Sequence, residues 1–435
     1  MTVAHVWSGA ATDTTATVVA RCTTGTSARL GYCAGTTWGT PTYTQAVAVT
    51  NGVARFDLTG LTKDTAYTYR IEEDGTLDTT NNHLHTVKVG EPYSFTFAAA
   101  SCAGLSPTYA GATANVSNSP VFGSIVDTDP LFFIHMGDLH YRDITTSSAA
   151  SYRTAFDDAL GESYPKAMFR AMPVVYMWDD HDFCGNDSGG DSANKATAQQ
   201  VYRERVPSHT IPGSGAVYHT FVVGRVRFIV TDLRSESSNR ATSDSESKVM
   251  LGATQEAWFK ATLAAATEQL VVWVNTLPWA IASPYLYDTD SWGYFDTERT
   301  RLWRWIASNG WAERLLMISG DNHANSIATG TNNPWGRWPV AQFGSLDATP
   351  VTKGGPFDWT EEGRGQFGTV EITDDGANVI GVTIKHRRDG TVRRTTSLSY
   401  PRLAPAQVVA ATMKTGSGLT IRNGIKVGVL ADGWR

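Results

Sequence analysis

Residues 131–141 read Leu-Phe-Phe-Ile-His-Met-Gly-Asp-Leu-His-Tyr, a short apolar run that passes directly into a Gly-Asp turn. A run of this length bounded by a turn signal is typical of a buried strand. In α/β sheets the carboxyl ends of parallel strands line one edge, and ligands and metals bind there. The stretch therefore predicts a buried strand that delivers Asp138 to such an edge.

Five other apolar runs end in the same way, each followed within a few positions by a residue type that can bind a metal. The runs and the residues that follow them are 95–100 with Cys102, 174–178 with Asp179-Asp180-His181, 226–231 with Asp232, 270–274 with Asn275, and 315–319 with Gly320-Asp321-Asn322-His323. One such coincidence would be trivial. Six of them predict a metal-dependent active site at the edge of a sheet.

The size and composition of the chain fit a globular enzyme. With 435 residues, we expect two or three domains. A hydrophobic content of 41% and a charged content of 18% are typical of a protein with a large core. The net charge of -6 argues against a nucleic-acid-binding platform. A phosphate-handling enzyme can nevertheless be acidic, because bound cations make its site locally positive.

The sequence leaves the cellular compartment of the protein undecided. No apolar stretch approaches the ~18 residues of a transmembrane helix. The first five residues, Met-Thr-Val-Ala-His, carry neither a basic segment nor a twin arginine, so we expect a cytoplasmic protein, or a periplasmic or secreted one if this is a processed form. Cys22 and Cys33 lie in neighbouring strand-like runs and either form a disulfide or remain two free thiols.

The pattern along the chain divides it into three parts. Residues 1–92 predict an all-β domain, because short Thr/Val/Ala alternations are separated by Gly, Asn and Asp. From residue 93 apolar runs alternate with helical patterns, which predicts βα units and a partly parallel sheet. The expected helices are 151–168, 192–206, 254–265 and 297–308, and the expected late strands are 369–372, 379–385 and 391–398.

The candidate ligands mix two kinds of donor. Hard cations prefer carboxylate and amide oxygens, whereas imidazole and thiolate suit iron or zinc. Such a mixture suits two metals of different character that share a bridging carboxylate, because two metals ~3.5–4 Å apart can activate a water and hold a phosphoryl oxygen together. The set contains Cys102, Asp138, Asp180, Asp232, Asn275, Asp321 and His323.

Four motifs in this set resemble those of a known family. In chain order they are Ser101-Cys102, Gly137-Asp-Leu-His-Tyr141, Trp178-Asp-Asp-His-Asp-Phe183 and Gly320-Asp-Asn-His323. They are similar to the first, second, third and last motifs of the metallophosphoesterase superfamily, in the variants of the alkaline phosphatase D family. Further similar stretches are Thr231-Asp-Leu-Arg-Ser235, Leu251-Gly-Ala-Thr-Gln-Glu-Ala-Trp258 and Ser291-Trp-Gly-Tyr294.

The resemblance implies a two-domain enzyme with an αββα metallophosphoesterase sandwich over residues 93–400. The family carries a β-sandwich ahead of its catalytic domain, which fits residues 1–92. Within that part, residues 58–70 resemble the tyrosine-bearing strand of fibronectin type III-like sandwiches. We expect residues 401–435 to form a tail or a small β element.

The resemblance also implies two metals. A ferric ion would be held by Cys102, Asp138, Tyr141 and His323. The second site is associated with calcium, with zinc, manganese and magnesium as alternatives. Asp138 would bridge to it, and Asp180 and Asp321 would complete it together with Asn275 or Asn186. The choice between the two asparagines stays open, because the third motif continues as Asp-Phe-Cys-Gly-Asn-Asp-Ser where many members have Glu and a longer stretch.

The implied activity is hydrolysis of small phosphate mono- or diesters by a metal-bound hydroxide. His181 would act as a general acid or transition-state donor, and Arg234 would approach a phosphate oxygen from a turn shaped by Asp232. One alternative is a phospholipase D-like phosphodiesterase, which turnover of monoesters and diesters would distinguish. Another is a binding module with a relic hydrolase domain, which an absence of bound metal would favour.

Overall fold

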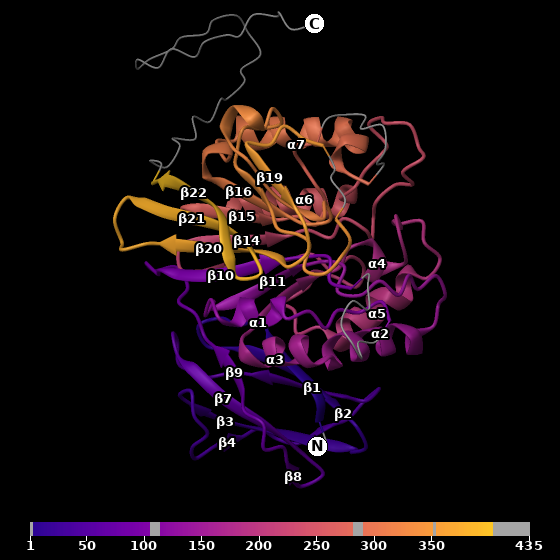
Figure 1. Ribbon diagram of the computed structural model, residues 1–435, viewed down its shortest axis with the longest axis vertical. Helices are drawn as coiled ribbons and strands as arrows, with labels where there is room; N and C mark the ends of the chain where they lie inside the picture. The colour runs from indigo at the N-terminus through magenta and orange to yellow at the C-terminus, as the bar shows by residue number, and fades with distance from the viewer. Residues whose placement is uncertain (1–2, 105–113, 282–289, 351–353, 403–435) are drawn as a thin grey trace, which may run out of the picture. The chain divides into compact units, whose positions relative to one another are not determined.

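Two facing β-sheets form the centre of the computed structural model, which describes residues 3–104, 114–281, 290–350 and 354–402 (Figure 1). The first sheet has the order β12 (Val174–Met177), β11 (Phe132–Met136), β10 (Phe95–Ala100), β20 (Gln366–Thr373), β21 (Val379–Arg388), β22 (Thr391–Pro401). The second has the order β13 (His219–Val223), β14 (Val226–Val230), β15 (Leu270–Val274), β16 (Leu315–Ser319), β18 (Val340–Gln342), β17 (Ala324–Ala328), β19 (Trp359–Glu362). The strands β10–β12 are parallel, as are β14–β16 and β18. The mixed α/β class is thus as expected.

The six predicted strands that precede candidate ligands all form, and they lie in the parallel parts of these sheets. Their sequences are predominantly apolar because both faces of the sheets are covered. Between the sheets, the Phe228 ring of β14 lies edge-on to Phe97 of β10 and Phe132 of β11, with centroids 5.4 and 5.6 Å apart. This packing brings the carboxyl ends of strands from both sheets to one region.

Helices cover the outer faces of the two sheets (Figure 1). On the second sheet, Phe259 of α6 packs on Trp273 of β15. On the first, Phe156 of α2 and Tyr202 of α5 contact Tyr176 of β12. The helices are α1 (Val121–Val126), α2 (Ala149–Gly161), α3 (Ser163–Ala171), α4 (Asp180–Phe183), α5 (Lys195–Arg205), α6 (Gly252–Ala265) and α7 (Asp296–Ser308), with the 3-10 turns η1 (Trp292–Phe295), η2 (Ala312–Arg314) and η3 (Gly330–Asn332).

The first part of the chain is all-β. Its strands are β1 (Val3–Gly9), β2 (Ala16–Cys22), β3 (Ser27–Ala34), β4 (Thr42–Tyr43), β5 (Val47–Ala48), β6 (Val53–Leu58), β7 (Ala66–Glu73), β8 (Thr76–Leu77) and β9 (Asn82–His85). One sheet has the order β1-β2-β6, and the other has β4-β3-β7-β8 with β5 on β3 and β9 on β7. Residues 1–402 form one compact unit. The domain boundary between 92 and 93 and the fibronectin type III-like topology stay predictions.

A half-buried ion cluster joins this all-β part to the α/β part. Asp157 of α2 accepts hydrogen bonds from His5 Nε2 at 3.2 Å, Arg21 Nε at 2.8 Å and Arg205 Nη1 at 2.9 Å. The ring of Trp7, next but one to His5, packs edge-on against helix α3. The all-β strands therefore cover helices α2 and α3.

The predicted helix 151–168 is in fact two helices. Glu162 is extended between α2 and α3, with φ −61° and ψ 150°. Pro165 explains the break, because a proline inside a continuous helix would remove a backbone hydrogen bond, whereas it is tolerated in the first turn of α3. Strand β17 was not predicted, since its sequence Ala-Asn-Ser-Ile-Ala is neither apolar nor alternating.

Cys22 and Cys33 are free thiols, so the second of the two alternatives for this pair holds. In the described part of the chain, none of the helices is long and apolar enough to cross a membrane. Residues 403–435 lie outside the described residues, as does the expected tail or small β element.

Candidate metal centre

The backbone turns sharply at the strand ends that carry the predicted ligands. Cys102, Asp138, Asp321 and His323 have φ angles of 61°, 58°, 59° and 45°. This left-handed region is uncommon for residues with a side chain, costs about 1–3 kcal/mol per residue, and clusters at functional sites. Each turn places a polar side chain directly after a buried strand.

Two motif glycines let these turns approach one another. A Cβ atom on Gly137 would lie 2.3 Å from the Cβ of Asp179, and one on Gly320 would lie 2.6 Å from the Cβ of Ser101. Atoms that are not bonded to each other do not approach this closely, so a side chain at either position would force the backbone to move. The glycines therefore explain how the ends of β10, β11, β12 and β16 meet in one place.

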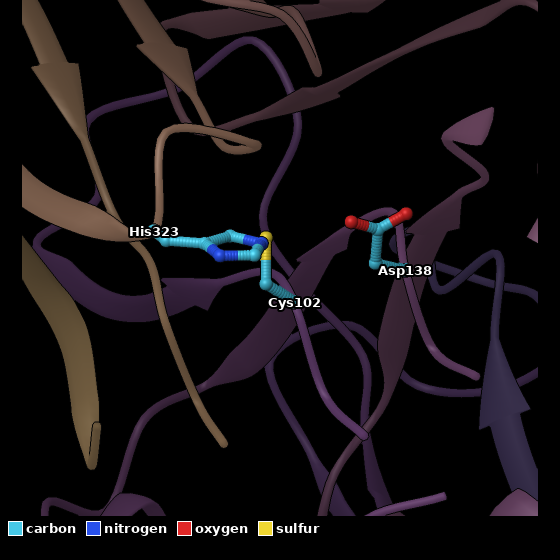
Figure 2. Close-up of side chains that lie close together, drawn as sticks. All are labelled: Cys102, Asp138 and His323. Carbon is cyan, nitrogen blue, oxygen red and sulfur yellow. The ribbon is translucent and has the colours of Figure 1, made fainter. Parts of the chain in front are cut away.

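The residues predicted to bind iron lie together. The ligand atoms of Cys102, Asp138 and His323 are all within 4.8 Å of one another (Figure 2). The Tyr141 hydroxyl lies 3.0 Å from Asp138 Oδ2 and 3.1 Å from His323 Nε2. His323 Nδ1 donates to the Thr349 carbonyl at 2.6 Å, which directs Nε2 towards the group. The structure thus brings all four predicted ligands into one cluster.

The carboxylates predicted for the second metal are adjacent to this cluster. Ligand atoms of Asp138, Asp180 and His181 lie within 4.8 Å of one another, and so do those of Asp179, Asp180 and Asp321. Asp180 belongs to both groups, and Asp138 also belongs to the cluster with Cys102. The two predicted sites therefore share one continuous set of carboxylates.

Three buried carboxylate oxygens in this set have no hydrogen-bond partner among the described residues: Asp138 Oδ1, Asp179 Oδ2 and Asp180 Oδ1. A buried, unpaired carboxylate oxygen costs free energy. Burial accordingly raises the pKa of Asp138, of Asp179 and of the Cys102 thiol well above their ordinary values. A bound cation reverses this cost, because it stabilises the deprotonated ligand. The donor set therefore fits bound metals.

Neighbouring side chains hold the third motif in place. Asp182 accepts hydrogen bonds from the Leu139 N–H at 2.9 Å and from the Tyr176 hydroxyl at 2.7 Å. It thereby ties the turn after β12 to the turn after β11. The Thr276 hydroxyl donates to Asp179 Oδ1 at 3.1 Å. These bonds position the carboxylates that point into the site.

His181 is held by two contacts. Its Nδ1 donates to Asp143 Oδ1 at 2.6 Å, and its ring lies against the Tyr141 ring with centroids 4.1 Å apart. Burial lowers the pKa of His181, but the carboxylates of Asp138, Asp143 and Asp180 outweigh burial and raise it to about 10. Without cations the imidazole is therefore positively charged at neutral pH.

Arg234 is fully buried beneath the carboxylates. Its Nε donates to Asp179, and Nη1 and Nη2 donate to the two oxygens of Asp290 at 3.1 and 3.0 Å. Asp232 accepts from the Arg234 N–H at 3.0 Å, so it shapes this turn as expected. All three guanidinium nitrogens have protein partners. To contact a phosphate oxygen as predicted, Arg234 would have to give up one of its hydrogen bonds to Asp179 or Asp290.

The two candidate asparagines lie differently. Asn275 donates from Nδ2 to the sulfur of Met317 at 3.5 Å, on the face of β15 and β16 that packs against helices α6 and α7. Asn186 is exposed, and its backbone N–H donates to Asp143 Oδ1 at 3.1 Å. Neither contact involves the carboxylates of the second site, but the Oδ1 of Asn275 is buried and has no hydrogen-bond partner among the described residues.

Three residues at the site were not among the predicted ones: Asp143, Arg240 and Asp290. Arg240 forms ion pairs with Asp187 at 2.8 Å and with Asp290 at 2.6 Å, next to Arg234. Asp143 follows Asp138 by five positions, and Asp290 directly precedes the quoted stretch 291–294. Proximity to a motif is the signal that would have pointed to both.

A family model described as PhoD-like phosphatase matches residues 97–362, which is more than half of the chain. The chain belongs to the PhoD-like phosphatase family. This confirms the resemblance inferred from the four motifs, and it supports metal-dependent hydrolysis of phosphate esters. A comparison with curated proteins yields no match.

Solved structures are similar in fold to this PhoD-like phosphatase. One is titled "Structure of PhoD", with a TM-score of 0.75 and 16% identity over 92% of this chain and 90% of that chain. Another is the purple acid phosphatase PPD1 from seeds of yellow lupin (Lupinus luteus), with a TM-score of 0.59 and 12% identity over 91% of this chain and 74% of that chain. At these identities the likeness concerns the fold.

Proposed function

We propose that this protein hydrolyses small phosphate mono- or diesters at a dinuclear metal centre. The observation that carries the proposal is the group of three buried carboxylate oxygens without a hydrogen-bond partner in the described residues, on Asp138, Asp179 and Asp180. The Asp180 oxygen also lies 3.6 Å from Arg234 Nη2. They lie beside a thiol, a phenol and an imidazole that converge on one point. This donor set suits two cations of different character, one with mixed sulfur, nitrogen and oxygen ligands and one with oxygen ligands.

In the proposed centre, Cys102, Asp138, Tyr141 and His323 would hold Fe³⁺. Asp138, Asp180 and Asp321 hold the second cation, which is Ca²⁺ by family resemblance, with zinc, manganese and magnesium as alternatives. When bound, the cations supply an activated water and neutralise charge on the phosphoryl oxygens. The asparagines at 186 and 275 stay predicted ligands. A buried Oδ1 without a hydrogen-bond partner in the described residues favours Asn275 over the exposed Asn186.

The protein's own groups then complete the reaction. Attack of hydroxide forms one P–O bond, and the bond to the leaving group breaks with its electron pair on the leaving oxygen. His181 donates a proton from Nε2 to that oxygen, because its Nδ1 is engaged by Asp143. The products are an alcohol and a phosphate or phosphomonoester, and His181 regains its proton from water. Arg234 holds Asp179 in place from below.

The test is the substitution Asp138→Asn. We expect hydrolysis of 4-nitrophenyl phosphate and of its diester to fall by at least about 10²-fold, because Asp138 would be a ligand in both proposed sites. Elemental analysis of the same preparations should show that metal content falls as well. Asp13→Asn, at a half-buried position of the all-β part, is the matched control and should behave as wild type.

Near-normal turnover by a folded Asp138→Asn protein would contradict the proposal. Comparison of kcat/KM for the monoester and the diester decides between a phosphomonoesterase and the phospholipase D-like alternative. A wild-type protein that contains neither iron nor a second cation, and hydrolyses neither ester, would favour the relic binding module.

A further inference from the structure

Asp143 lies between two parts of the site. It follows β11, five positions after Asp138, and has a φ angle of 48° in the left-handed region. Its Oδ1 accepts two hydrogen bonds, from His181 Nδ1 at 2.6 Å and from the Asn186 N–H at 3.1 Å. Both donors belong to the chain segment that follows β12. One carboxylate oxygen therefore links the loop after β11 to the histidine of the third motif.

This contact determines which nitrogen of His181 faces the site. A carboxylate only accepts hydrogen bonds, so Nδ1 must carry a proton and Nε2 is the nitrogen left for the substrate. A ligand nitrogen of His181 also lies within 4.8 Å of ligand oxygens of Asp138 and Asp180. The histidine is thus beside the atoms proposed to hold the cations.

A second contact fixes the tilt of the ring. The Tyr141 ring lies 4.1 Å from the His181 ring between centroids, with an angle of 39° between their planes. The bond to Asp143 restrains rotation within the ring plane, and Tyr141 covers one face. The side chain of His181 is 15% exposed and that of Asp143 is 46% exposed, so the pair lies at the mouth of the site rather than beneath it.

We propose that Asp143 is a positioning residue that acts through His181, holding the imidazole so that Nε2 donates its proton to the leaving-group oxygen. This rests on the proposed hydrolysis of phosphate esters. The rival explanation is that Asp143 merely anchors its loop through the Asn186 N–H. The two explanations differ in how the effect of a substitution depends on the leaving group.

A proton donor matters most when the leaving oxygen is strongly basic. A good leaving group, such as 2,4-dinitrophenolate, departs without a proton, whereas phenolate gains much from one. A positioning residue for the donor should therefore have a large effect on phenyl phosphate and a small one on 2,4-dinitrophenyl phosphate. Loosening of the loop would instead slow all esters by a similar factor.

The experiment compares wild type with Asp143→Asn on 2,4-dinitrophenyl, 4-nitrophenyl and phenyl phosphate, with protein carrying its full metal content. We expect kcat for phenyl phosphate to fall by about 10²-fold or more, and kcat for the dinitrophenyl ester to stay close to wild type. Asp158→Asn is the matched control. Asp158 pairs with Arg142, the neighbour of Asp143, so the control loosens the same loop without touching His181. It should leave all three rates unchanged.

Two further variants make the result independent of how well Asp143→Asn folds and show whether Asp143 acts through His181. Asp143→Ser also removes the carboxylate and should show the same selective loss, so the proposal can be judged even if the asparagine variant does not fold. In a His181→Asn background, Asp143→Asn should have no further effect on phenyl phosphate, because both residues would act as one unit.

An equal loss for all three esters, or unchanged turnover of phenyl phosphate, would overturn the role of Asp143 while leaving the proposed function intact. A metal-loaded wild-type protein that hydrolyses none of the esters would overturn the proposed function, and the role of Asp143 with it.

Discussion

At the residue scale, the chemistry of the site depends on groups that are costly to bury. Cys102 is fully buried, and burial raises the pKa of its thiol well above the ordinary value. Burial does the same to the pKa of the Tyr141 phenol. Neither group ionises in the free protein at neutral pH, so deprotonation has to accompany metal binding.

The Tyr141 hydroxyl offers a direct test of the iron assignment. A phenolate bound to Fe³⁺ should give the purified protein a visible charge-transfer band, and Tyr141→Phe should abolish that band. We expect the variant to keep its fold, because the substitution removes one hydroxyl and retains the ring that packs on His181. A band of unchanged intensity in Tyr141→Phe would show that Tyr141 is not a ligand.

At the element scale, the strands follow from the local sequence, whereas the turns at their ends, which carry the site residues, do not. The runs 95–100, 270–274 and 315–319 were predicted with the bounds that the structure has, since continuous apolar sequence is a strong signal for a strand buried on both faces. The turns after them depend on close approach between strands distant in sequence. Gly320, for example, packs on Ser101, more than two hundred residues earlier.

We therefore expect Gly320→Ala to disturb the site from the backbone outward. The added Cβ would meet Ser101 at 2.6 Å, so the turn that carries Asp321 and His323 must shift. The free energy of unfolding should fall by about 1–3 kcal/mol, and the metal content should fall with it. Denaturant unfolding and elemental analysis measure the two effects, with the exposed Gly39→Ala as control, since its Cβ would meet nothing within 4 Å.

The same scale shows where prediction from the sequence ends. The motifs identified Cys102, Asp138 and His323, because each follows an apolar run in a known pattern. For Asp143 the sequence offers only its proximity to a motif, since its partner His181 is 38 residues away and their contact depends on two loops meeting. Asn275 was predicted from its place after β15, and it stays a predicted ligand: its Nδ2 contacts Met317, while its Oδ1 is buried without a hydrogen-bond partner among the described residues.

At the scale of the whole molecule, the all-β part and the catalytic part are joined through Asp157. Three cationic or imidazole donors, on His5, Arg21 and Arg205, converge on this carboxylate. Burial raises the pKa of Asp157, but its hydrogen bond to His5 and the charge of Arg205 outweigh burial and lower the pKa below its ordinary value. A lowered carboxyl pKa stabilises the fold above the unfolded value, and this contribution is lost as the pH falls through the folded value.

Asp157→Asn should consequently destabilise the protein by about 2 kcal/mol at neutral pH. The difference from wild type should shrink as the pH falls below 3.8, because the wild-type carboxyl is then protonated as well. Thermal or urea unfolding across this pH range checks the sign. A difference that grows in acid would contradict the assignment. The leaving-group dependence of hydrolysis should stay unchanged, since Asp157 does not contact the metal centre.

The predicted iron ligands come from both central sheets, Cys102 and Asp138 from one and His323 from the other. A bound ion would therefore act as a cross-link between the two halves of the molecule. Thermodynamic linkage then couples metal affinity to the packing of the two sheets. A change that separates the sheets weakens metal binding, and a bound metal stabilises the contact between the sheets. The hydrolytic centre would in this way also be a part of the protein's structural framework.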